Sequence, residues 1–261
     1  MKKILTAIFV LAVLLFSVFS VSALTSSEAK QAWFDAREAS REAQEDHREA
    51  KVDYAADPSP DNEQALIDAG KIVLNAALDE AEAWLVWKNL EVGENPEIPD
   101  DLKENIQEDV ETNLAKIDEL RADVDGIDTR LELGLVFLKM VGKYTELLAD
   151  VARNTGMVWV HIGNTYADDI EAYEADLRES AESMEDNEAV IEKLDMARDE
   201  LENARENIDD AEETYGQVVI PGTPLIKFAE GNNYLRNARG NLILAHSYLE
   251  QAYRLMVAGG E

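Results

Sequence analysis

The sequence predicts an all-α protein: an elongated multi-helix bundle of long antiparallel helices with coiled-coil seams. Between breaks, apolar residues recur at spacings of three and four, the period of an amphipathic helix. The six prolines fall in three clusters, at 58–60, 96–99 and 221–224. Proline stops a helix but fits its first turn, so each cluster marks one helix end and the next start. A hydrophobic content of 46% is too high for a disordered acidic chain.

The first 23 residues have the features of a signal peptide. Lys2 and Lys3 precede an apolar stretch at 4–21, and small residues up to Ala23 fit a cleavage site. We expect the mature chain to begin at Leu24. The alternative is an uncleaved membrane anchor, because about 18 apolar residues are nearly enough to span a bilayer. In either case the rest of the chain is expected outside the cell or at its surface, with the membrane touched only through an uncleaved leader.

The remaining chain, 24–261, is predicted to be one helical bundle. Its six helices are expected at about 26–56, 60–92, 99–124, 129–184, 187–217 and 224–257. Thr25 with Glu28, and Thr129 with Glu132, have the spacing of capping boxes at the first and fourth helices. The segment 185–187, Glu-Asp-Asn, offers an N-cap for the fifth helix.

Five of the six helices carry a stripe of apolar residues that predicts the buried face. In the fifth and sixth helices the stripes follow an a/d heptad pattern. These two stripes are Val190, Leu194, Ala197, Leu201, Ala204, Ile208, Ala211 and Tyr215, and Leu235, Ala238, Leu242, Ala245, Leu249, Ala252 and Met256. The third helix carries Leu102, Ile106, Val110, Leu114, Ile117, Leu120 and Val124, and the first carries Ala32, Ala36, Ala39, Ala43 and Ala50.

The fourth helix is the longest predicted element. Its expected stripe is Leu131, Leu135, Leu138, Leu148, Ala152, Trp159, Ile162, Tyr166, Tyr173 and Leu177. Gly142, Gly156 and Gly163 are expected to allow bends. The segment 157–162 is apolar nearly all round, which predicts burial on every side. The first half of this helix is expected to pair with the third helix and the second half with the fifth.

Six short segments of the N-terminal half lie at 36–43, 50–55, 84–91, 98–99, 104–106 and 116–120. With these segments the chain resembles uncharacterised secreted helical proteins of archaea. The resemblance implies a leader followed by a helical ectodomain. It implies no activity.

The charge of the chain limits its partners. Asp and Glu number 55 and Lys and Arg 24, which gives a net charge of −31. Such a surface repels nucleic acid and suits cations or basic partners. The simpler interpretation is that the charge only keeps an exposed protein soluble.

The sequence predicts no catalytic, cofactor or metal site, and so no enzyme. Cysteine is absent, which excludes thiolate ligands and nucleophiles. A di-iron bundle needs Glu three residues before His, but His47, His161 and His246 follow Gln44, Val158 and Ile243. No pair of histidines has the spacing for zinc. The many paired carboxylates are expected to form solvated helix faces.

Two functions remain open. The first is an extracytoplasmic structural or interaction protein of the cell envelope, which self-associates or binds a partner protein through its helical seams. The second is a ligand-binding or sensing bundle with a pocket near Trp159, His161 and Tyr166. The aromatic residues on the helices are expected to be core or, alternatively, an exposed patch for a partner. A buried cavity lined by Trp159, His161 and Tyr166 would favour the second function.

Overall fold

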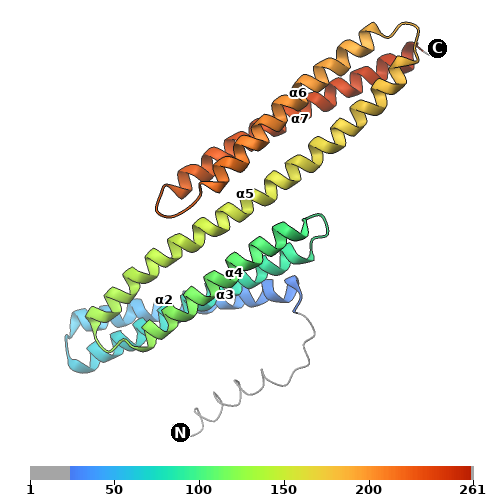
Figure 1. The fold of residues 1–261 in the computed structure, drawn as a ribbon. Helices are drawn as coiled ribbons and strands as arrows, with labels where there is room; N and C mark the ends of the chain where they lie inside the picture. The colour runs from blue at the N-terminus through green and yellow to red at the C-terminus, as the bar shows by residue number, and fades with distance from the viewer. Residues whose placement is uncertain (1–23, 260–261) are drawn as a thin grey trace. The chain divides into compact units, whose positions relative to one another are not determined.

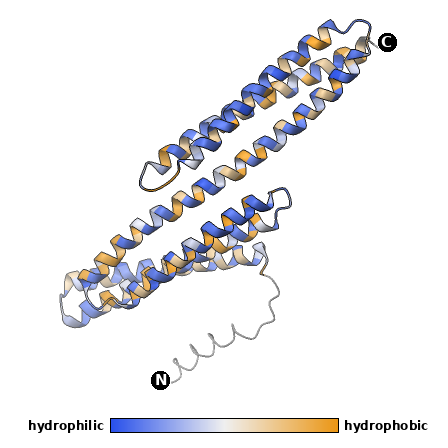
Figure 2. Cartoon of the chain, viewed as in Figure 1, coloured by the Kyte–Doolittle hydropathy of each residue, from blue (hydrophilic) through white to orange (hydrophobic). Residues whose placement is uncertain are grey.

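Six α-helices and no strand make up the part of the chain that the computed structural model describes, residues 24–259 (Figure 1). The helices are α2 (Ser26–Ala56), α3 (Pro60–Glu94), α4 (Asp100–Asp125), α5 (Arg130–Glu182), α6 (Glu188–Gly216) and α7 (Pro224–Gly259). They contain 89% of the described residues, and every bound lies within two residues of its prediction. Figure 2 shows hydrophobic and hydrophilic residues alternating along the helices, as expected of amphipathic elements. The all-α multi-helix bundle is therefore confirmed.

The predicted leader and its cleavage point after Ala23 lie outside the described residues. Among the helices that are described, none is long and apolar enough to cross a membrane.

The helix ends follow local sequence chemistry. Thr25 and Glu28 form the predicted capping box, and so do Thr129 and Glu132, where each backbone N–H is bound by the other residue's side chain. Asn187, in the segment predicted to cap α6, is the N-cap residue of that helix, but its side chain makes no capping hydrogen bond. The side chain instead donates to the carbonyl oxygen of Ala181 at 3.0 Å, near the end of α5. Asn187 therefore satisfies a terminal carbonyl of the preceding helix.

The described chain divides into two compact units, and the division runs through α4 and α5. The N-terminal unit contains the residues up to Pro96 together with Leu114–Val136. The C-terminal unit contains Glu97–Asn113 and the residues from Phe137 onward.

In the N-terminal unit, α2 and α3 form a hairpin, and its seam differs from the predicted alanine stripe. Ala32 and Ala39 are exposed, whereas Ala29, Ser40 and Ala43 are buried. The seam is set by Trp33, whose ring stacks on that of Trp87 of α3 with centroids 5.0 Å apart. Burying an alanine side chain contributes little free energy, so alanine is tolerated on either face of a helix. Burying a tryptophan contributes much more, and Trp33 therefore decides which face of α2 is buried.

Small residues make up more than half of the buried positions of α5. They are Ala149, Gly156, Val160, Ala167 and Ala181, beside the larger Met140, Leu147, Glu174 and Leu177. The predicted stripe was therefore mostly wrong: six of its members are among the exposed large hydrophobic residues, namely Leu131, Leu135, Leu138, Leu148, Trp159 and Tyr166. Small side chains let the backbones of neighbouring helices approach closely.

Gly156 and Gly163, two of the three α5 glycines expected to allow bends, are close packing positions. The helix is continuous from Arg130 to Glu182. A Cβ atom built on Gly156 would lie 2.4 Å from the Tyr215 ring, and one on Gly163 would lie 3.3 Å from the Ile208 side chain. Both neighbours belong to the predicted seam of α6, and all eight residues of that seam are buried.

Helices α6 and α7 lie side by side (Figure 1). The predicted α7 stripe faces the core, where Ala238, Ala245, Leu249 and Ala252 are buried. Leu235 and Leu242 pack against the same core. The seam between α6 and α7 is thus closed within the chain.

Tyr215 is the largest fully buried side chain of the described residues. Its ring lies against Gly156 of α5 and Gly231 of α7, and its hydroxyl donates to Oδ1 of Asn232 at 2.8 Å. Burial raises the pKa of the Tyr215 hydroxyl to about 12. A buried phenol resists ionisation because the phenolate loses its hydration.

The raised pKa predicts a stability loss in alkali that depends on Tyr215. Below pH 10 the Tyr215 hydroxyl is protonated in both the folded and the unfolded protein. Above pH 10 the unfolded protein loses this proton first, which favours unfolding. At pH 8 we expect Tyr215→Phe to lower the unfolding free energy by about 1 kcal/mol, the value of one hydrogen bond. Near pH 11 the wild type loses about 1.4 kcal/mol, so the two proteins should become equally stable. Urea titrations at pH 8, 10 and 11 measure this, and a constant difference between the two proteins would contradict it.

Candidate functional site

An open groove runs along the C-terminal unit between α5 and α7, with a volume of about 700 Å³. One wall consists of the α5 residues Trp159, Ile162, Gly163, Tyr166 and Ile170. The other consists of the α7 residues Asn232, Leu235, Arg236, Ala238, Arg239, Leu242, Ile243 and His246, and Ile208 of α6 also lines it. In each wall the lining residues lie on one face of the helix. The groove volume lies in the range of about 300–1,000 Å³ that is typical of ligand-binding sites.

The groove is apolar and open to solvent along its rim. Trp159 is 54% exposed, Tyr166 61% and Ile243 59%. Leu235 and Leu242 are partly buried and connect the groove to the core beneath it. A continuous set of large exposed apolar side chains on a protein surface is a feature of interaction sites.

The charges of the groove are opposite to those of the rest of the chain. No carboxylate lines it, whereas the guanidinium groups of Arg236 and Arg239 do. Helix α7 has four Lys or Arg residues and two Glu, and no acidic residue occurs at 231–249. Each of the other five described helices has more acidic than basic residues. The groove is therefore a locally basic, apolar surface on an acidic protein.

The two arginines of the groove are available to a partner. Arg236 donates to Oδ1 of Asn233 at 2.9 Å and has no carboxylate partner among the described residues. Arg239 is exposed and makes no hydrogen bond or ion pair within residues 24–259. His246 lies 3.6 Å from Glu250, on the same helix.

The structure places two of the three predicted pocket residues in this groove. Trp159 and Tyr166 share the groove, but His161 does not line it. Nε2 of His161 donates to the carbonyl oxygen of Glu97 at 2.7 Å. The segment 157–162 was also predicted to be buried on all sides, and only Val160 in it is fully buried. Successive residues of a helix are rotated by about 100°, so His161 faces away from the groove formed by Trp159 and Ile162.

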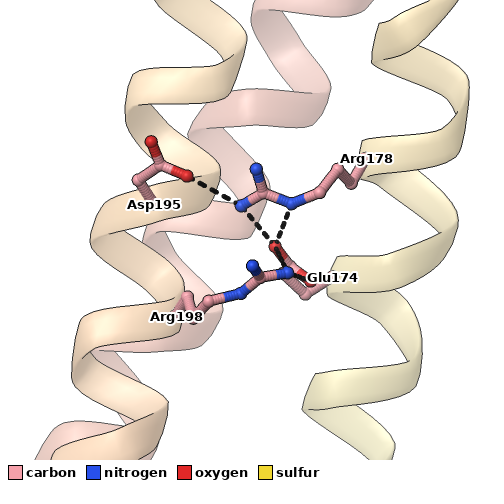
Figure 3. Close-up of polar contacts among 4 residues, drawn as sticks. All are labelled: Glu174, Arg178, Asp195 and Arg198. Atoms are coloured by element: carbon pink, nitrogen blue, oxygen red, sulfur yellow. Dashed lines mark hydrogen bonds and ion pairs between the residues drawn. The ribbon is translucent and has the colours of Figure 1, made fainter.

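A buried carboxylate joins α5 and α6 farther along the same unit (Figure 3). Glu174 is 4% exposed. Arg178 lies 2.6 Å from its Oε1 and Arg198 lies 3.0 Å from its Oε2, while Arg178 also reaches Asp195 at 2.9 Å. These arginines compensate the charge of Glu174, so the cluster fixes the pairing of two helices and offers no free ligand group.

The other candidate groups do not line the groove. Among the described residues, no group of three or more His, Asp or Glu side chains is arranged to hold a metal ion. Trp87 is buried and Trp33 half-buried in the α2–α3 hairpin, as expected for core aromatics. Nδ1 of His47 is buried without a hydrogen-bond partner in the described part of the chain, and burial lowers the pKa of this residue. Cation binding by the acidic surface stays a prediction.

No family model, curated protein or solved structure matches this chain. The resemblance to secreted archaeal proteins therefore stays a prediction.

Three residues of the α7 wall, Arg236, Arg239 and Ile243, were missed in the sequence analysis, whereas Leu235, Ala238 and Leu242 belong to the predicted stripe. The predicted α7 stripe contained the residues that pack on α6, and Arg236, Arg239 and Ile243 lie outside it. The signal that could have found them is the absence of acidic residues at 231–249 in a chain that is otherwise rich in them.

Proposed function

We propose that this protein is an exported, non-catalytic interaction protein of the cell envelope, and that the groove between α5 and α7 is its binding surface. The observation that carries this proposal is a groove with apolar walls and two arginines in a chain of net charge −31. Exposed apolar surface of this extent is unfavourable in water. A negatively charged partner that binds there buries the apolar side chains and forms ion pairs with the arginines. The apolar leader at 4–21 supports export.

The α6–α7 seam does not serve as this binding surface, because its residues are buried within one chain. Replacing Leu249 by Asp would therefore test folding and not association. The exposed residues of the groove are suitable for a test, since Ile243 can be changed without disturbing the core.

A photo-crosslinking residue at Ile243 should form an adduct in the cells that make this protein. The matched control is the same residue at Glu202, which is exposed on α6, away from the groove. We expect an adduct from position 243 and none from 202, in a fraction outside the cytoplasm, on chains that begin at Leu24. An adduct of about twice the chain mass would identify a second copy. Equal labelling at both positions, or a protein that stays in the cytoplasm, would contradict the proposal.

A second candidate function is the binding or sensing of a small ligand, which the groove volume of about 700 Å³ would also permit. The open rim argues against it, because small ligands are usually buried over about 70–90% of their surface. In the crosslinking experiment this function would produce adducts of low mass.

A further inference from the structure

We propose that the groove binds an acidic amphipathic helix of another protein, which lies beside α5 and α7 as an additional helix of the C-terminal unit. This inference rests on the proposed function and names the chemistry of the partner. Three properties of the groove support it: the spacing of its walls, its length with its open side, and its charge.

The walls are spaced to receive side chains from a helix. On α5 the lining residues Trp159, Ile162, Tyr166 and Ile170 follow each other at intervals of three and four. On α7 the intervals between Leu235, Arg239, Leu242 and His246 are four, three and four. A third helix that presents apolar residues at the same spacing can insert these side chains between the lining side chains of α5 and α7, as in other helix-in-groove complexes.

The length of the groove corresponds to a few turns of helix. Asn232 and His246 are the outermost lining residues of α7, and at a rise of about 1.5 Å per residue they are about 21 Å apart. A partner helix of about four turns fills this length. Such a helix would cover the rim residues Trp159, Tyr166 and Ile243 from the solvent side, and it would keep its own outer face in water.

The charge of the groove selects an acidic helix. Arg236 and Arg239 are three residues apart, so they project from neighbouring turns of the same wall. Glu residues that flank the apolar stripe of the partner can pair with them, whereas Lys residues would be repelled.

A second copy of this chain does not meet these requirements. Its most acidic helices are α4 and α6, and neither shows an exposed large hydrophobic residue among those described. The exposed apolar residues of α5 at 131–148 lie among Arg130, Lys139 and Lys143, with only two acidic residues in the same range. The apolar stretch of α5 at 131–148 and the two most acidic helices are thus different segments, whereas the proposed partner combines an apolar stripe and negative charge on one helix.

Two synthetic peptides provide the test. Both are amphipathic helices of about 18 residues with one apolar stripe, which is flanked by Glu in the first peptide and by Lys in the second. Binding to the protein is measured by the fluorescence anisotropy of the labelled peptide at low salt. We expect the acidic peptide to bind about tenfold more tightly than the basic one, and added NaCl to reduce the difference.

The variant Arg236→Glu/Arg239→Glu should bind the basic peptide more tightly than the acidic one. The variant Trp159→Ala should bind both peptides more weakly than the wild type. The matched control is Arg254→Glu, because Arg254 is an exposed arginine of α7 that does not line the groove and already pairs with Glu250. It should keep the preference of the wild type.

Failure to bind either peptide, equal binding of both, or a preference that survives the Arg236→Glu/Arg239→Glu change would overturn the inference. So would saturable binding of dodecanoate in the groove by a protein that binds no peptide. If the acidic peptide binds as expected but Ile243 forms no adduct in cells, the proposed function fails and the helix specificity stands.

Discussion

Gly156→Ala should be among the most destabilising single-methyl changes in this protein. The new Cβ would lie 2.4 Å from two atoms of the Tyr215 ring. The ring cannot retreat, because a Cβ built on Gly231 on the α7 side would already lie 2.7 Å from it. Overpacking of this kind costs about 1–3 kcal/mol or more, and the better helix propensity of alanine offsets only about 1 kcal/mol. We expect a net loss of about 2 kcal/mol in the unfolding free energy.

Gly142→Ala is the matched control, since Gly142 lies in the same helix and nothing lies within 4 Å of its added Cβ. It should stabilise the protein by about 0.5–1 kcal/mol through helix propensity alone. Urea unfolding followed by circular dichroism compares the two variants. The double variant Gly156→Ala/Tyr215→Leu should lose less than the sum of its single changes, because the smaller side chain makes room for the methyl group. Equal effects of the two alanines would show that Gly156 is not a close-contact position.

Arg178→Met/Arg198→Met should cost about 3 kcal/mol, because it leaves the buried carboxylate of Glu174 without its compensating charges. The methionines keep the apolar stems of the arginines, so the loss reports on the charge. Adding Glu174→Met to this variant should restore most of the stability, since a buried ion cluster can often be replaced by apolar residues at little cost. Thermal unfolding of the double and triple variants measures the difference.

The control for this series is Arg205→Met, which removes another arginine between α6 and α5. Its partners Asp168 and Glu171 have side chains that are 69% and 61% exposed, whereas the Glu174 side chain is 5% exposed. Exposed pairs contribute about 0–1 kcal/mol, so this variant should remain close to the wild type. If Arg205→Met loses as much stability as Arg178→Met/Arg198→Met, the burial of Glu174 does not determine the loss of stability.

The sequence alone determined the six helices and most of their ends. Proline at the first turn, the Thr25 and Thr129 capping boxes and the apolar period are local signals that need no partner. All eight residues of the predicted α6 stripe are buried, because most large apolar residues of this helix lie on one face. There, periodicity and burial select the same face.

The tertiary structure decided which face of α5 and of α2 is buried, and with it the groove. Helix α5 carries large apolar residues on several faces, so its pattern admits more than one buried face. The face that packs is the one with Gly156, Gly163 and Ala167, because the buried side chains of α6 need room against the α5 backbone. Trp159 and Tyr166 then remain on the open side, where α7 brings Arg236 and Arg239 beside them. Hydropathy measures how favourable burial is for one residue, but shape complementarity between helices decides which residues are buried.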